Sequence, residues 1–190
     1  MKTRLLLPLV LASALSLPAL AAPKSYSIDN KHSFPRFSHV HLGLSTQVSR
    51  FDKISGEVIY DAEKNTGKVD ISIDMSSVST GSDLFNEHLM AEDFFHTEKY
   101  PTARFKSTRT HWQGPTLEAI DGELTIKGVT RPVTLTVTRF VTKDHPMAKK
   151  PAIGADAYVV VKRSDFNMGK YAPAVSDEVR IDIAFEALQK

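Results

Sequence analysis

Apolar and polar residues alternate along most of the chain. Val69, Ile71, Ile73 and Met75 are separated from one another by single polar residues. Because successive side chains of a β-strand point to opposite faces, this spacing puts one apolar and one polar face on the segment. The same alternation recurs at Ile120, Gly122, Leu124 and Ile126, at Val133, Leu135 and Val137, and at Val179, Ile181, Ile183 and Phe185. These segments are predicted to be half-buried strands.

The number and spacing of such segments indicate an all-β domain. Further strands are expected at residues 26–30, 34–42, 51–60, 102–110 and 155–163. Polar connections at residues 61–67 and 127–132 predict hairpins, and therefore antiparallel neighbours. Eight or so antiparallel strands can form a sandwich or a barrel, and a barrel removes the exposed edges of the sheet. The alternation does not decide between a lumen filled by side chains and one that holds a ligand.

One segment departs from the strand pattern. Between residues 82 and 91, Leu84, Phe85, His88 and Leu89 have the spacing of one helix face, and Ser82 or Asp83 could cap the helix. Phe94 and Phe95 follow directly. We expect a short helical insertion that covers one end of the sheet, where it either plugs the core or borders a ligand.

The N-terminus has the features of an export signal. Lys2 and Arg4 precede an almost wholly apolar run that ends in Ala19-Leu20-Ala21, which predicts a signal peptide over residues 1–21 and a mature domain over residues 22–190. The chain has no Cys, so neither a disulfide nor a lipidated cysteine is expected.

The charge balance argues against nucleic acid as a partner. The chain has 24 Lys and Arg against 22 Asp and Glu, and loss of Lys2 and Arg4 would leave 22 of each. A neutral domain lacks the broad basic face that nucleic-acid binding needs.

Enzyme signatures are mostly absent. The glycine spacing excludes a dinucleotide fingerprint, a phosphate-binding loop and a nucleophile elbow. His39 and His41 lie two apart on a predicted strand, where a third metal ligand could come from His88 or His96. A Ser33, His41 and Asp29 triad can also be written, so a His-dependent metal or serine hydrolase remains the alternative function. We predict no metal, no cofactor and no catalytic residue.

Several short motifs, in order, resemble the YceI-like family. They are Tyr26-Ser27-Ile28-Asp29, His32-Ser33, residues 37–51 with His41-Leu42-Gly43-Leu44-Ser45, Gly56-Glu57-Val58, Glu87-His88-Leu89, Asp93-Phe94-Phe95, residues 100–107, residues 122–133 and residues 162–166. Each motif is weak alone, but together they span about residues 25 to 188.

The resemblance implies a fold and a function. It implies an eight-stranded antiparallel, lipocalin-like barrel in the bacterial periplasm, with a lumen that holds a long-chain amphiphilic lipid such as a polyprenyl chain, a quinone tail or a fatty amide. The protein would then be a carrier or sequestering protein and not an enzyme. A transient membrane contact, for instance at Lys149 and Lys150, is compatible with this role, and the oligomeric state stays open.

The resemblance and the strand phase together suggest a ligand site. His41 matches a family position, whereas relatives usually place an apolar residue where this chain has His39. The expected ligand contacts are Phe37, His39, His41, Ile71, Ile73 and Met75 in the wall, Leu84, Phe85, Leu89, Phe94 and Phe95 at the mouth, and Phe105 and Phe166, which could equally be plain core.

Overall fold

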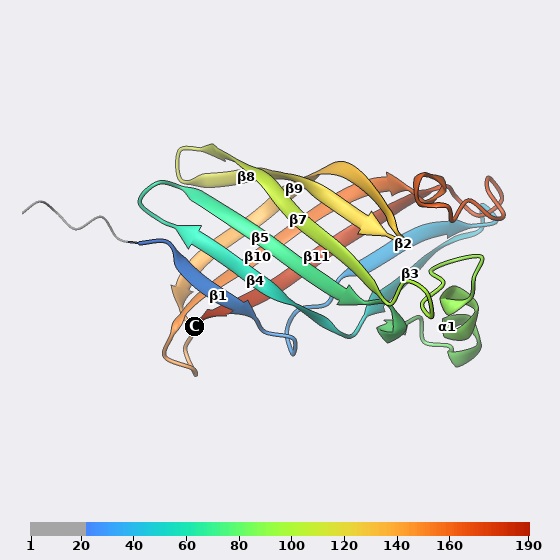
Figure 1. The fold of residues 1–190 in the computed structure, drawn as a ribbon, viewed down its shortest axis with the longest axis horizontal. Helices are drawn as coiled ribbons and strands as arrows, with labels where there is room; N and C mark the ends of the chain where they lie inside the picture. The colour runs from blue at the N-terminus through green and yellow to red at the C-terminus, as the bar shows by residue number, and fades with distance from the viewer. Residues whose placement is uncertain (1–21) are drawn as a thin grey trace, which may run out of the picture.

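The computed structural model describes residues 22–190, so the expected signal peptide lies outside the described residues. The chain forms a long antiparallel barrel with one helix at its end (Figure 1). The strands are β1 (Lys24–Ile28), β2 (Arg36–His41), β3 (Ser45–Phe51), β4 (Ile54–Asp61), β5 (Thr66–Asp74), β6 (Val78–Ser79), β7 (Thr102–Gln113), β8 (Thr116–Ile126), β9 (Val129–Asp144), β10 (Pro151–Lys162) and β11 (Glu178–Gln189). The helix is α1 (Asp83–Met90), and the short 3-10 turns are η1 (Met75–Ser77) and η2 (Arg163–Phe166).

Eight strands close the barrel, in the order β1, β4, β5, β7, β8, β9, β10, β11 and back to β1. The predicted all-β class and the eight-stranded antiparallel barrel are therefore confirmed. Strand β11 makes the closure: residues 187–189 pair with β1, and residues 180–182 pair with β2. Strands β1 and β2 thus lie along the same long neighbour, with a break between them.

Ser33 fills the break between β1 and β2. Its side chain is fully buried, and its hydroxyl donates to the carbonyl of Glu186 at 3.2 Å and accepts the N–H of Glu186 at 3.0 Å. A buried backbone group needs a partner, and here a side chain replaces the missing strand neighbour. The break therefore leaves no orphaned polar group on β11 at this residue.

Strand β3 was not predicted. It pairs with β2 to form a hairpin, and β6 pairs with its end. Its sequence, STQVSRF, is exposed except at Ser49 and Phe51, which lie on the same face. Only one of these two buried residues is apolar, so the repeated apolar and polar alternation that predicts the other strands is missing here.

The two ends of the barrel differ. The β4–β5, β7–β8 and β9–β10 hairpins lie at the end that carries the C-terminus, and α1 and the β2–β3 hairpin lie at the other end (Figure 1). At the C-terminal end, the Tyr60 and Trp112 rings stack with centroids 5.8 Å apart, and Phe140 packs edge-on against both. This aromatic cluster fills the interior between β4, β7 and β9.

The predicted helix is confirmed over Asp83–Met90. Ser82 occupies the N-cap position, but its side chain makes no capping hydrogen bond. Instead, Asn86 Oδ1 accepts the N–H and the hydroxyl of Thr80 at 2.9 and 2.8 Å, which ties the helix to the end of β6.

Gly56 has the least room for a side chain among the glycines of the described residues. Its φ is +144°, and a Cβ built there would lie 2.2 Å from the carbonyl oxygen of Asp70 on β5. Substitution Gly56→Ala should therefore lower the free energy of unfolding by about 2 kcal/mol or more, because neither strand can move aside without breaking the ladder. Urea denaturation measures this change.

Gly154→Ala is the matched control, since a Cβ on this β10 glycine meets no atom closer than 4.0 Å. It should change the free energy of unfolding by less than about 1 kcal/mol. Equal losses for the two variants would contradict the steric argument.

Candidate functional site

The barrel encloses a cavity of about 440 Å³ that runs from its interior to the helix end. Its wall is contributed by strands all around the ring and by the helix and loops at the mouth. The lumen is therefore not filled by its own side chains. All but six of the lining residues are apolar, which suits a hydrocarbon occupant.

Twelve of the thirteen expected contact residues line this cavity. They are Phe37, His39, His41, Ile71, Ile73, Met75, Phe85, Leu89, Phe94, Phe95, Phe105 and Phe166. The predicted strand phase of β2 and β5 thus gives the inward face correctly. Phe166 is 1% exposed and serves both the core and the cavity wall.

Leu84, which is expected at the mouth, is the one residue of this set that does not line the cavity. Its side chain is 78% exposed and is absent from the cavity lining. With about 100° per helical residue, Leu84 and Leu89 mark the two edges of an arc of roughly 140°. The helix turns Phe85, His88 and Leu89 toward the lumen, which leaves Leu84 on the solvent side.

The polar part of the cavity wall is basic. Its six non-apolar residues are Arg36, His39, His41, His88, Arg163 and Tyr171, and no carboxylate is among them. His39 is half-buried and makes no side-chain hydrogen bond or ion pair among the described residues. Burial lowers the pKa of His39, and electrostatic interaction with the neighbouring Arg163 and His41 lowers it further. The ring is therefore neutral near pH 7 and free to meet a polar group in the lumen.

Arg163 fixes one side of the mouth. Its guanidinium is buried and donates to four carbonyls of the loop that leads to β11, those of Met168, Lys170, Val175 and Ser176, at 2.5 to 2.9 Å. Burial lowers the pKa of Arg163, opposed by the nearby Asp177 carboxylate. The sequence motif at residues 162–166 contains Arg163, but it gives no sign that this one side chain orders the nine loop residues 168–176.

A second set of contacts joins this loop to the segment after α1. Lys127 Nζ donates to the carbonyls of Glu92 at 2.7 Å and Asn167 at 3.0 Å, and Lys170 forms an ion pair with Asp93. The Phe94 and Tyr171 rings lie 6.3 Å apart. The mouth is thus a connected frame and not a set of independent loops.

Comparison with known proteins agrees with this architecture. A family model described as a YceI-like domain matches residues 26–187. The protein YceI of Escherichia coli O6:H1 is 36% identical over 189 residues, which covers 97% of each chain. The chain belongs to the YceI-like family.

Solved structures share the YceI-like barrel. Burkholderia cenocepacia BcnA has a TM-score of 0.72 and 28% identity, covering 84% of this chain and 98% of BcnA. A polyisoprenoid binding domain from Saccharophagus degradans has a TM-score of 0.67 and 20% identity, covering 88% of this chain and 99% of that domain. The latter likeness concerns the fold alone.

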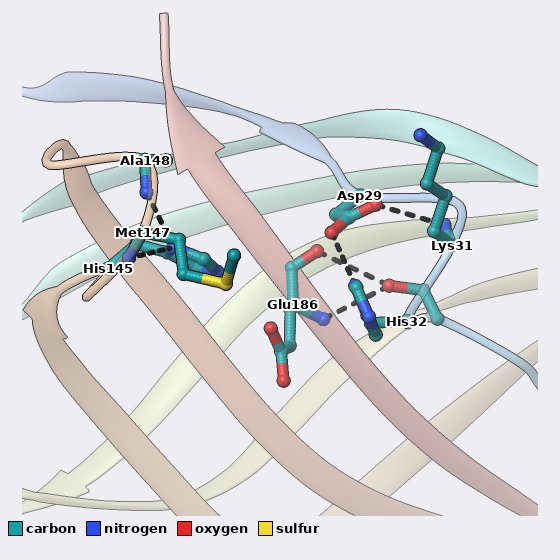
Figure 2. A network of polar contacts seen from close by, with 8 residues as sticks. Asp29, Lys31, His32, His145, Met147, Ala148 and Glu186 are labelled. Carbon is teal, nitrogen blue, oxygen red and sulfur yellow. Dashed lines mark hydrogen bonds and ion pairs between the residues drawn. The ribbon is translucent and has the colours of Figure 1, made fainter.

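The hydrolase alternative finds no support in the geometry of this YceI-like barrel. The Asp29 carboxylate bonds the Nδ1 of His32 at 2.7 Å and accepts the N–H of Lys31 (Figure 2). The Ser33 hydroxyl is held by the backbone of Glu186. His41 lies at the cavity mouth instead. The triad of Ser33, His41 and Asp29 is therefore not assembled.

The histidine metal cluster of the alternative function is not assembled either. Among residues 22–190, the group of three potential ligands whose atoms all lie within 4.8 Å is Asp29, His32 and Glu186, outside the lumen (Figure 2). The hydrogen bond from His32 lowers the pKa of Asp29, and the same contact raises the pKa of His32. These opposite shifts are those of an exposed ion pair, and His39 and His41 take no part in it.

Other features lie away from the mouth. Lys149 and Lys150 belong to the β9–β10 turn at the C-terminal end (Figure 1).

Within residues 22–190, no helix has the length and apolar character needed to cross a bilayer.

The lowered pKa of His39 predicts an acid-sensitive stability. A base with a depressed pKa in the folded state binds its proton more readily when unfolded, so its contribution is unchanged above about pH 6.5 and is lost as pH falls toward the folded pKa. His39→Leu should remove this component. The difference between the unfolding free energies of the two proteins should therefore change between about pH 8 and pH 5, with the parent losing more stability at the lower pH. Identical pH profiles would show that burial of His39 has no energetic effect.

Arg163→Lys should destabilise the protein by about 3 kcal/mol or more, because an ammonium cannot reach the four carbonyls that the planar guanidinium serves. Limited proteolysis should then cut within residues 168–176. Arg131→Lys is the control, since Arg131 is exposed and makes one backbone contact at 3.2 Å. A stable, protease-resistant Arg163→Lys protein would contradict the role assigned to the guanidinium.

Proposed function

We propose that the protein is a periplasmic carrier or sequestering protein that binds the hydrocarbon chain of an isoprenoid, quinone or other amphiphilic lipid in the barrel lumen. The observation that carries the proposal is an apolar cavity that ends at a mouth with only basic and phenolic polar residues. A cavity of this composition binds by burial and needs no catalytic group.

The energetics support a long apolar chain. Each methylene removed from water contributes about 0.8 kcal/mol, so about fifteen buried carbons contribute roughly 12 kcal/mol before the costs of ordering the ligand are subtracted. The cavity of about 440 Å³ falls in the usual size range of small-molecule sites. A cavity of this kind selects its ligand by the length and shape of the hydrocarbon chain more than by individual functional groups.

The arrangement of polar groups gives the ligand a direction. Its tail would lie toward the deep wall formed by residues such as Leu135 and Val159, and its polar head would lie near His39, His41 and Arg163. The unpartnered ring of His39 can donate to or accept from such a head, whichever tautomer it adopts. The absence of carboxylates in the wall favours a head that is anionic or rich in hydrogen-bond acceptors.

Two further points agree with the proposal. The barrel resembles a structure described as a polyisoprenoid binding domain, which has the same architecture. Residues 1–21 have the composition of a cleaved export signal, and a chain without Cys needs no oxidation step to fold after export.

Native mass spectrometry of the protein, purified without detergent, tests the proposal. We expect a stoichiometric apolar adduct that solvent extraction releases, or uptake of added polyprenol, quinone or fatty amide by an empty protein. An empty protein that takes up none of these compounds would overturn the carrier function.

A matched pair of variants tests the site itself. Val161 lines the cavity, whereas its neighbour Val160 is exposed on the outer face of β10. Val161→Asp should abolish the adduct or unfold the barrel, because an isolated carboxylate in an apolar lumen is costly to desolvate. Val160→Asp should leave both the fold and the adduct unchanged. Full ligand content in Val161→Asp would show that the lumen is not the binding site.

A further inference from the structure

Exposed apolar side chains gather at the cavity mouth. The large apolar residues that are mostly solvent-facing within the described chain are Val40, Leu42, Leu44, Val48, Leu84, Met147, Val160 and Tyr171. Six of the eight belong to the β2–β3 hairpin, to α1 or to the loop before β11, the segments that border the mouth. Leu44 and Leu84 are the most exposed of these six, with 82% and 78% of their surface accessible to solvent. A concentration of this kind marks a contact surface.

The hairpin and the loop are held in fixed relation. The N–H of Val40 donates to Ser176 Oγ, and the N–H of Ser176 donates to the carbonyl of Val40, both at 2.9 Å. His41 and Val175 form an additional bridge. The exposed residues of the hairpin therefore project from a framework that is already ordered.

The exposed surface continues into the lumen. Leu42 and Tyr171 are each 53% exposed, yet both also line the cavity. On α1, Phe85 lines the cavity while its neighbour Leu84 faces solvent. A hydrocarbon chain could pass from this surface into the cavity along apolar side chains, without crossing water.

The distribution of charged residues distinguishes the β2–β3 hairpin from the rest of the mouth. Between Arg36 and Phe51 the chain contains no Asp or Glu, although it contains Arg50, His39 and His41. The helix, in contrast, carries Asp83 and Glu87. A surface with exposed leucines and without carboxylates is compatible with phospholipid headgroups, which are zwitterionic or anionic. The hairpin is therefore the part that suits a bilayer best.

We propose that the barrel docks mouth-first on a phospholipid bilayer, with the tip of the β2–β3 hairpin inserted among the headgroups. Leu44 inserts deepest, and Leu84 and Tyr171 contact the bilayer surface beside it. The lipid ligand enters and leaves across this contact, a step that rests on the proposed function. Lys149 and Lys150 face away, since their turn lies at the other end of the barrel (Figure 1).

Vesicle flotation tests the docking. The protein, purified without detergent, should float with vesicles of phosphatidylethanolamine and phosphatidylglycerol. Leu44→Asp should reduce the bound fraction at least tenfold, and Leu44→Asp with Leu84→Asp should abolish binding. Met147→Asp is the control, since Met147 is 87% exposed at the opposite end, and it should float like the parent. A parent protein that stays with the unbound fraction, or a Leu44→Asp variant that floats equally well, would overturn the proposal.

Uptake of a radiolabelled polyprenol separates docking from ligand binding. Neither Leu44 nor Leu84 lines the cavity, so Leu44→Asp should take up polyprenol from detergent micelles normally but at least tenfold more slowly from vesicles. Equal slowing from both sources would place Leu44 in ligand binding and overturn the docking role. A parent that floats but takes up no polyprenol from either source would support docking while contradicting the proposed function for this ligand.

Light scattering tests the competing occupant. A parent protein that is dimeric and a Leu44→Asp variant that is monomeric, without flotation of either, would show that a second copy covers the tip and would overturn bilayer docking. A monomeric parent that floats supports it.

Discussion

The pairing of β11 with both β1 and β2 is the interaction on which the rest of this structure depends. Without it the sheet would have free edges, and the inward faces of the strands would not be enclosed by a complete ring. The joint is imperfect because the chain breaks between β1 and β2. The buried hydroxyl of Ser33 accepts the N–H of Glu186, and it donates to the Glu186 carbonyl together with the N–H of Asp29. Ser33, which the sequence alone allows as a member of a catalytic triad, is thus a structural residue at the break between β1 and β2.

Closure gives the barrel an interior, and the two ends decide what that interior can do. Stacked and edge-on rings of Tyr60, Trp112 and Phe140 fill the end near the C-terminus. At the other end, the helix, the β2–β3 hairpin and the loop held by Arg163 surround the cavity mouth. This polarity makes the mouth the natural place both for a ligand head and for contact with the membrane that would supply it.

Much of this arrangement could be predicted from the sequence, for a specific reason. Strands with one buried face, such as β5 and β11, must alternate, and a register shift by one residue would turn every apolar side chain to water. That rule places Phe37 and His39 on one face and points Ile73 to the interior, and the resemblance to the YceI-like family points the face of Phe37 and His39 inward. Strand β3 escaped prediction because only Ser49 and Phe51 are buried in it. The helical spacing could not tell whether Leu84 lines the cavity, because an apolar residue at the edge of a helical stripe can face either way.

By itself, the sequence determined the strand periodicity, the antiparallel connections, the helical insertion and the resemblance to the YceI-like family, because each of these is written in local spacing or in the order of short motifs. Only the tertiary structure decided that the sheet closes, that the lumen is left open and that its polar lining is basic. Those properties depend on how side chains from all strands meet across the interior. The clustering of exposed leucines at one end has the same origin, since residues 44, 84 and 171 are distant in the chain and are brought to one mouth by the fold.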